Sequence, residues 1–166
     1  MASVVRAYVA LGSNLNDPAR QVRSGLDALA GLDVVRLAAR SSLYRTPPMG
    51  PAGQPDYVNA VAAIDTALPP LTLLDRLLDI ERRHGRVRDG ERWGPRTLDL
   101  DLLLHGETRL CDDRLTLPHP GIAARVFVLA PLAEIAPDLD IPGLGLVREL
   151  LAALPPSPIE RLPADA

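Results

Sequence analysis

The sequence predicts a single α+β domain in which helices pack against an antiparallel sheet. Its 166 residues are enough for one domain with a hydrophobic core, and 47% of them are hydrophobic. Only 3% are aromatic, so the core is expected to be built from aliphatic side chains. Segments with strand and helix character alternate in the order β-α-β, β-α-β, and neither an internal repeat nor a linker divides them.

The first βαβ unit lies at the N-terminal end of the chain. Residues 4–11 are apolar and run into a turn signal, which predicts a strand. A helix follows, with Pro18 at its first position, Asn16 or Asp17 as its N-cap, and apolar residues at helical spacing. Residues 34–44 have the character of a second strand.

The second unit begins after a turn-rich loop at residues 46–55. Residues 57–66 predict a third strand, and the pair Pro69-Pro70 opens a second helix that ends at Gly85. A fourth strand is expected at residues 98–105. Two consecutive βαβ units of this kind match the pattern of a ferredoxin-like (split βαβ) sandwich.

The C-terminal third predicts shorter elements. Residues 109–117 are expected to form a hairpin, and residues 122–135 and 146–154 are expected to be short helices. The Pro-rich stretch 155–166 is expected to fray. The domain is therefore predicted to occupy residues 1–154, followed by this tail.

All 18 basic residues are arginine, and the chain contains no lysine. This composition excludes a P-loop lysine, the strand lysine of protein kinases and catalysis through a Schiff base. If phosphate is bound, arginine is expected to bind it as a planar bidentate donor. The net charge of −3 argues against a nucleic-acid partner, because such proteins are usually basic as a whole.

Three further features bear on location. The single cysteine, Cys111, has no partner for an intramolecular disulfide, which suits a reducing compartment. The N-terminus runs into a strand pattern without the character of a signal peptide. No apolar run approaches the roughly 20 residues of a membrane span. We therefore expect a cytoplasmic protein with no membrane partner.

Asp99 and Asp101 stand two residues apart within the fourth predicted strand. Because side chains alternate along a strand, both carboxylates share one face while the intervening leucines enter the core. Neighbouring carboxylates repel each other unless a cation is present, and Mg²⁺ takes one or two carboxylates together with waters and phosphate oxygens. The alternative is a solvated acidic face, since an isolated Asp-x-Asp is common. The arginine-rich loop beside the pair favours the metal site.

The segment before this strand forms a long loop of the kind that often closes over a ligand. It carries four arginines, which are Arg86, Arg88, Arg92 and Arg96. Arginines placed in this way can neutralise and orient a polyphosphate, although a solvated cationic loop is the alternative. Trp93 either closes over a ligand or caps the core. Glu81, near the end of the preceding helix, either pairs with one of the arginines or is a surface residue.

The ten residues from Arg92 to Asp101, RWGPRTLDLD, resemble the signature of the 6-hydroxymethyl-7,8-dihydropterin pyrophosphokinase family, which acts in folate synthesis. Further matches to the family follow in the same order along nearly the whole chain. They are Leu11–Leu15, Tyr44–Pro48, Gln54–Asn59 and Leu115–Pro120. The chain is thus identified as a member of this family.

The resemblance implies an activity and a set of residue roles. The hydroxymethyl oxygen of the pterin attacks the β-phosphorus of ATP, and AMP is released. Asp99 and Asp101 are implied to hold two Mg²⁺ ions, and Arg86 and Arg96 to stabilise the transferred charge. No nucleic acid or membrane takes part, and a monomer is the family-based expectation.

The resemblance also divides the remaining site residues between the two substrates. The ATP-binding positions are Arg88, Arg92, Trp93, Leu102, Arg114, Thr116 and His119. The pterin-binding positions are Thr46, Pro47, Tyr57, Asn59, Trp93, Asp99 and Phe127. A flat heterocycle favours aromatic faces and an amide that complements its edge, which agrees with this second set. Without the resemblance, Phe127 is interpreted as a core aromatic, Asn59 as an ordinary strand or turn residue and His119 as a loop histidine.

Three positions depart from the family pattern and bear on nucleotide affinity. Asp89 stands where the best-known member has a lysine, Pro120 replaces a tyrosine, and Leu78 replaces a polar residue near the nucleotide base. Two other functions stay open from the residues alone. One is a non-catalytic module that binds RNA or a regulatory nucleotide, and the other is a two-metal phosphohydrolase. The family also occurs fused to aldolase or pteroate synthase domains, for which we expect this length to leave no room.

Overall fold

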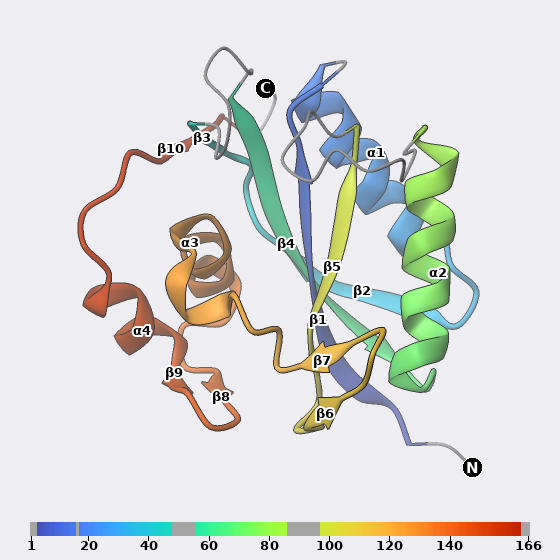
Figure 1. The fold of residues 1–166 in the computed structure, drawn as a ribbon. Coiled ribbons are helices and arrows are strands. Elements are labelled where there is room, and N and C mark those ends of the chain that lie inside the picture. The colour runs from blue at the N-terminus through green and yellow to red at the C-terminus, as the bar shows by residue number, and fades with distance from the viewer. Residues whose placement is uncertain (1–2, 16, 48–55, 86–96, 164–166) are drawn as a thin grey trace.

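The computed structural model describes residues 3–15, 17–47, 56–85 and 97–163. Within these ranges, helices cover both faces of a central sheet (Figure 1). Helices α1 (Pro18–Ala30) and α2 (Pro70–Arg83) pack on one face, and α3 (Val126–Ile135) and α4 (Val147–Ala153) lie on the other.

The sheet interleaves the strands of two βαβ units. Its strands are β1 (Val5–Ser13), β2 (Val35–Arg40), β3 (Tyr44–Thr46), β4 (Tyr57–Thr66), β5 (Asp99–His105) and β10 (Glu160–Arg161). Their order is β10-β3-β4-β1-β5, with β2 also paired to β4, and each of these pairings is antiparallel. Strand β4 therefore lies between β1 and the strands that follow α1, while β1 lies between β4 and β5. This interleaving confirms the predicted split βαβ, ferredoxin-like architecture.

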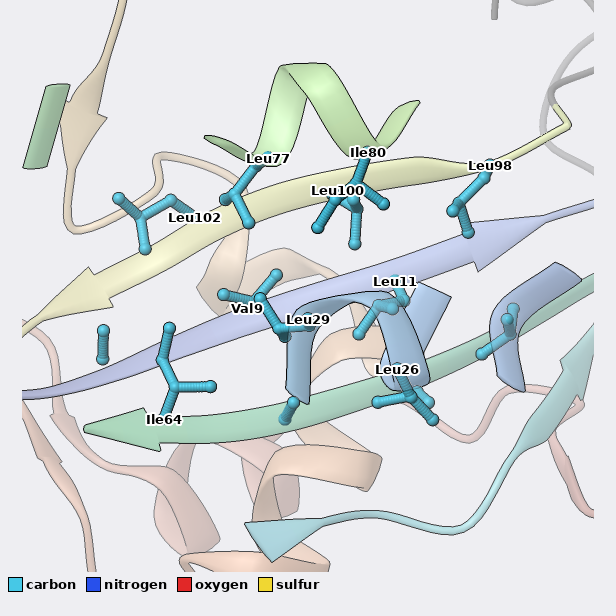
Figure 2. Close-up of a cluster of buried hydrophobic side chains, with 14 of the residues drawn as sticks. Val9, Leu11, Leu26, Leu29, Ile64, Leu77, Ile80, Leu98, Leu100 and Leu102 are labelled. Carbon is cyan, nitrogen blue, oxygen red and sulfur yellow. The ribbon is translucent and has the colours of Figure 1, made fainter. Parts of the chain in front are cut away.

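The face of the sheet beneath α1 and α2 carries the larger hydrophobic core. Val9 and Leu11 of β1 lie opposite Leu102 and Leu100 of β5, so both strands direct these side chains into the same layer. Figure 2 shows them beside aliphatic side chains of the two helices, which are Leu26, Leu29, Leu77 and Ile80. Full burial of an aliphatic side chain of this size contributes roughly 1.5–3 kcal/mol, so this layer holds both helices on the sheet.

The opposite face carries a second cluster. Tyr8 and Val61 of the sheet pack there with Val128, Leu129 and Leu132 of α3. Since Tyr8 and Val9 are neighbours in β1, they supply opposite faces, as the alternation of a strand requires. The sheet is thus buried on both sides, which explains why β1 and β4 are almost continuously apolar.

Smaller elements complete the fold. They are the hairpin β6 (Leu110–Cys111) and β7 (Thr116–Leu117), the 3-10 helix η1 (Ile122–Ala124), and the hairpin β8 (Asp140–Ile141) and β9 (Gly145–Leu146). The first hairpin confirms the one predicted at residues 109–117, whereas the second was not expected. Asp17 stands at the predicted N-cap of α1, with a φ of 61° and without a side-chain capping hydrogen bond. Among the described residues, no helix has the length and apolar character needed to cross a membrane.

Two elements that were expected to be continuous are interrupted. The predicted strand at residues 34–44 is divided into β2 and β3, because the side chain of Ser41 also bonds to β4. The Val61 N–H donates to Ser41 Oγ over 2.9 Å, and the Ser41 N–H donates to the Val61 carbonyl over 2.9 Å. The predicted helix at residues 122–135 becomes η1 and α3, because Arg125 between them is extended, with φ −117° and ψ 103°.

The C-terminal tail differs from its prediction. Residues 155–166 were expected to fray, but β10 pairs with β3, with Glu160 opposite Arg45. The next residue, Leu162, is 7% exposed and belongs to the larger core, and its N–H donates to the carbonyl of Leu43 over 2.8 Å. The expectation of a frayed tail was therefore wrong for residues 160–162. A domain boundary at residue 154 stays a prediction.

Candidate active site

The acidic pair lies on the edge strand of the sheet. Asp101 and Asp99 of β5 stand opposite Ala10 and Gly12 of β1. The leucines that alternate with them, Leu98, Leu100 and Leu102, enter the core beneath α1 and α2, and Leu100 is 3% exposed. The predicted alternation is therefore confirmed, and the two carboxylates share the face that also carries the start of α3.

Glu81 of α2 supports the edge strand from the opposite side. The Leu100 N–H lies between the two aspartates and donates to Glu81 Oε2 over 2.8 Å. An edge strand has backbone donors without a strand partner, and a carboxylate satisfies this one inside the protein. Glu81 is only 2% exposed, so its interpretation as a surface residue was wrong. Its hydrogen bond holds the backbone of β5 at the position from which both aspartates project.

A first cavity, which we call the ring cavity, opens on the acidic face of the sheet and has a volume of about 430 Å³. Six of the predicted pterin-binding residues line it. They are Thr46, Pro47, Tyr57, Asn59, Asp99 and Phe127. They come from β3 and the residue after it, from β4 and β5, and from the first turn of α3, so residues far apart in the sequence meet at one site. This volume is within the range of small-ligand pockets.

Hydrogen bonds and close packing fix the polar wall of the ring cavity. The side-chain amide Nδ2 of Asn59 donates to Thr46 Oγ1 over 3.2 Å, and each of these residues is 6% exposed. Gly12 of β1 faces the other side of the same amide. A Cβ atom at Gly12 would lie only 2.8 Å from Asn59 Oδ1, so glycine is needed for this close approach.

The aromatic wall of the ring cavity comes from the start of α3. Phe127 is half-buried and lines the cavity, and the guanidinium carbon of Arg125 lies 5.8 Å from the centroid of its ring. This distance is within the range of a cation–π contact. Because α3 begins only after the extended Arg125, the interruption of the predicted helix orients both side chains toward the site.

A second cavity, which we call the nucleotide cavity, lies between α2, β5 and the β6–β7 hairpin and has a volume of about 960 Å³. Four of the predicted ATP-binding residues line it. They are Leu102, Arg114, Thr116 and His119. Arg114 forms an ion pair of 2.5 Å with Asp75 of α2, in which both side chains are about half exposed, at 49% and 59%. Leu78 and Pro120, which depart from the family pattern, also line this cavity.

Asp99 and Asp101 line both cavities. A ligand in the ring cavity and a ligand in the nucleotide cavity therefore approach the same two carboxylates from different sides. Within the described part of the chain, no group of three or more His, Cys, Asp or Glu side chains is arranged to hold a metal. A site with two carboxylates suits Mg²⁺, which completes its shell with waters and phosphate oxygens.

His119 is held in a defined protonation state. The Gly121 N–H donates to His119 Nδ1 over 3.0 Å, so the neutral imidazole carries its proton on Nε2. Burial lowers the pKa of His119 below its ordinary value of 6.5, while Asp101 opposes this effect and Arg125 adds to it. The side chain therefore presents a neutral N–H donor at the nucleotide cavity.

The predicted cationic half of the site lies outside the described residues. This group comprises Arg86, Arg88, Arg92, Trp93 and Arg96, together with the departing residue Asp89. The roles expected of them stay predictions. The residues that line the ring cavity and were not predicted from the sequence include Arg125, Ser157 and Pro158. Arg125 could have been predicted as a site residue, because it lies two residues before the only phenylalanine, which was assigned to the site. Ser157 and Pro158 could not, because they lie in a Pro-rich stretch that resembles a disordered tail.

The fold and the site together define a class: a ferredoxin-like α+β protein in which two ligand cavities meet at a pair of aspartates. Comparison with known proteins gives the family. The family described as 7,8-dihydro-6-hydroxymethylpterin-pyrophosphokinase (HPPK) matches residues 8–137, and the chain belongs to it.

Two curated relatives agree with this assignment over nearly their full length. A 2-amino-4-hydroxy-6-hydroxymethyldihydropteridine pyrophosphokinase of Pseudomonas aeruginosa is 57% identical over 160 residues, which cover 96% of this chain and 98% of that protein. A protein of the same name from Haemophilus influenzae is 51% identical over 148 residues, covering 89% of this chain and 92% of that one.

Solved structures show the same fold at lower identity. The wild-type HPPK-DHPS of Plasmodium falciparum, crystallised with pteroate, superposes with a TM-score of 0.73 at 12% identity. The match covers 90% of this chain and 44% of that one, so this chain spans less than half of that longer polypeptide. At this identity the likeness supports the fold alone.

Proposed function

We propose that this protein transfers a pyrophosphoryl group from ATP to the hydroxymethyl group of 6-hydroxymethyl-7,8-dihydropterin and releases AMP, in folate biosynthesis. The observation that carries the proposal is the position of Asp99 and Asp101, which line both the ring cavity and the nucleotide cavity. Two substrates that must react with each other need a shared boundary, and these carboxylates form it.

The reaction exchanges one phosphorus–oxygen bond for another. The hydroxymethyl oxygen forms a bond to the β-phosphorus, the bond between this phosphorus and the oxygen of the α-phosphate breaks, and the hydroxyl proton passes to solvent. Because no protein nucleophile takes part, the protein acts by alignment of the two substrates and by electrostatic stabilisation. This mechanism requires no lysine, so it is compatible with a chain that contains none.

The ring cavity binds the pterin. Phe127 and Tyr57 offer aromatic faces to the flat ring. The buried amide of Asn59 forms hydrogen bonds with the donors and acceptors along the edge of the ring. Thr46 holds this amide in one orientation through the hydrogen bond of 3.2 Å, so the recognition group is positioned before the substrate binds. The hydroxymethyl group then lies toward Asp99, at the boundary with the nucleotide cavity.

The nucleotide cavity binds ATP. Arg114 offers a cationic fork, Thr116 a hydroxyl group, and His119 a neutral Nε2–H, and these donors suit phosphate and ribose oxygens. Leu102 is nearly fully buried at 2% exposure and contributes apolar surface to the cavity. The ion pair of Arg114 with Asp75 is exposed, so the guanidinium exchanges partners at little cost when a phosphate arrives.

Asp99 and Asp101 suit two Mg²⁺ ions, whose chemistry is to neutralise the triphosphate and to polarise its oxygens. Side chains of the protein supply the remaining charge stabilisation and the closure over the substrates. Arg86 and Arg96 are proposed to stabilise the transferred charge, and Arg88, Arg92 and Trp93 are proposed to close over the triphosphate. The roles of these five residues depend on the family resemblance. We further propose that the protein acts as a monomer in the cytoplasm, without a nucleic-acid or membrane partner.

Nucleotide analysis after incubation with Mg²⁺, ATP and the pterin tests the proposed function. AMP formed only when the pterin is present supports it. Formation of ADP, or formation of AMP at the same rate with and without the pterin, contradicts it. Release of inorganic phosphate instead indicates a phosphohydrolase, and Mg²⁺-dependent ATP binding without turnover indicates a non-catalytic module.

A further inference from the structure

We propose that residues 157–162, which we call the strap, form a substrate-binding wall of the ring cavity, and that Arg161 is the positioning residue that holds this wall in place. The inference rests on the proposed function, since it assigns the strap to the pterin. In Figure 1 the chain leaves α4, runs past α3 and then lies beside β3 as β10. The strap therefore joins the two elements that carry the other walls of the cavity.

The strap reaches the cavity directly. Ser157 and Pro158 line the ring cavity together with Thr46 and Pro47 at the end of β3 and Phe127 at the start of α3. These three segments are distant in the sequence and meet at one cavity. The HPPK family match ends at residue 137, so this third wall comes from a part of the chain beyond the match.

The C-terminal end of the strap is anchored to β3. The strand pairing of β10 places Arg161 opposite Tyr44, and the Leu162 N–H donates to the Leu43 carbonyl over 2.8 Å. The side chain of Leu162 is buried in the larger core at 7% exposure. The chain that leads to this anchor is rich in proline, so it loses little conformational entropy when it is fixed in place. Pro158 itself lines the cavity.

The second anchor ties the strap to α3 through one carboxylate. Arg161 donates from Nε to Ser42 Oγ over 3.0 Å and from Nη2 to Glu134 Oε2 over 3.1 Å. Glu134 belongs to α3 and also accepts the Ser42 N–H over 2.9 Å and the Tyr44 hydroxyl over 2.7 Å. The carboxylate thus joins α3, the entry to β3 and the strap at a single point.

The charge state of this junction is well defined. Burial works against ionisation of Glu134, but the hydrogen bonds from Tyr44 and Ser42 outweigh it, and the pKa of Glu134 lies below its ordinary value. Burial and the hydrogen bond to this carboxylate raise the pKa of Tyr44 to about 12. The ionised carboxylate is therefore available to Arg161 throughout the neutral range, and the wall is held in place before substrate binds.

The first experiment releases the strap in the full-length protein. We expect Arg161→Ala to raise the KM for the pterin by roughly fivefold, the effect of losing a charge-assisted hydrogen bond, while the KM for ATP and kcat stay near wild type. Arg161→Lys keeps the charge and should recover part of the loss. The matched control is Arg148→Ala, which removes another exposed arginine paired with a carboxylate, that of Asp138, and should leave both KM values unchanged.

The second experiment changes the wall itself. Pro158→Trp places a bulky side chain at the cavity and should also raise the KM for the pterin severalfold. Pro155→Trp places the same side chain three residues earlier, at an exposed residue that does not line the cavity, and should have no effect. Calorimetry in the presence of a non-hydrolysable ATP analogue should show weaker pterin binding to Pro158→Trp than to Pro155→Trp, whose affinity should match that of wild type.

The outcomes separate this inference from the proposed function. If wild-type protein forms AMP in a pterin-dependent way but Arg161→Ala and Pro158→Trp have a pterin KM within twofold of wild type, the strap is no substrate wall. An equal loss for both substrates, accompanied by a lower Tm, would mean that the strap only stabilises the fold, and it also overturns the inference. If wild-type protein forms no pterin-dependent AMP, the proposed function itself fails.

Discussion

The ring cavity and the nucleotide cavity share two aspartates but are built in different ways. Two polar groups of the ring cavity, Asn59 and Thr46, are each 6% exposed and bonded to each other. The nucleotide cavity is more than twice as large and includes half-exposed Arg114, which is paired with the similarly exposed carboxylate of Asp75 on α2. One cavity is preorganised by the core of the protein, and the other offers exchangeable surface charges.

This difference corresponds to the chemistry of the two ligands. A flat heterocycle is recognised by shape and by a fixed pattern of donors and acceptors, which rigid buried groups provide best. A triphosphate carries its own charge and its own metal ions, so mobile cations and carboxylates suffice to orient it. We therefore expect substitutions in the ring cavity to be selective for the pterin and substitutions at the shared aspartates to affect both substrates.

The largest effect is expected where the two cavities meet. Asp99→Ala or Asp101→Ala should lower kcat by at least roughly a thousandfold, because both substrates lose the carboxylates at which they react. Stability should be maintained, since each substitution removes one member of a pair of like charges. Single-turnover assays and thermal unfolding measure the two effects. Unfolding of either variant at room temperature would show that the pair is structural.

A smaller and selective effect is expected at the aromatic wall. Phe127→Ala removes one face of the ring cavity and should raise the KM for the pterin by roughly tenfold or more, as expected for a lost aromatic contact. The KM for ATP should change little, because Phe127 does not line the nucleotide cavity. Phe127→Leu is the matched control, since it keeps apolar area without the aromatic face. Equal changes in both KM values would contradict the separation of the two cavities.

The close approach of Gly12 to Asn59 provides a test of preorganisation. In Gly12→Ala the new Cβ would lie 2.8 Å from Asn59 Oδ1, so the amide must move away from its position beside Thr46. We expect a loss of about 1–3 kcal/mol in stability from overpacking and a pterin KM raised by severalfold. Gly31→Ala is the control, because a Cβ there meets no atom closer than 3.4 Å. Wild-type pterin affinity in Gly12→Ala would show that the amide needs no fixed position.

Sequence reasoning reached some parts of this site and missed others for physical reasons. The shared face of Asp99 and Asp101 follows from the alternation of a strand, which is a local property. The grouping of Thr46, Asn59 and Phe127 came from the family resemblance, because no local spacing brings three distant segments together. The strap was predicted to fray because its composition suggests disorder, yet Leu162 pairs and packs with residues more than 100 positions away. Likewise, the break at Ser41 depends on a hydroxyl group that bonds across the sheet.

The smallest effect is expected at His119, which belongs to the nucleotide cavity. Burial lowers the pKa of this histidine below its ordinary value of 6.5, so the folded protein favours the neutral imidazole. The stability that this preference contributes is fully present above pH 6.5 and is lost as the pH falls from there through the lower pKa of the folded state.

Protonation of His119 removes the acceptor of the Gly121 N–H but keeps the Nε2–H donor and adds a positive charge, so the KM for ATP should fall over the same pH interval while the KM for the pterin stays nearly constant. His119→Gln, which does not titrate, should flatten both the stability and the ATP profile between pH 5 and 7. Thermal unfolding and steady-state kinetics across this interval measure the two effects. A pH profile of His119→Gln identical to that of wild type would assign the titration to another group and leave the nucleotide cavity without a pH-dependent donor.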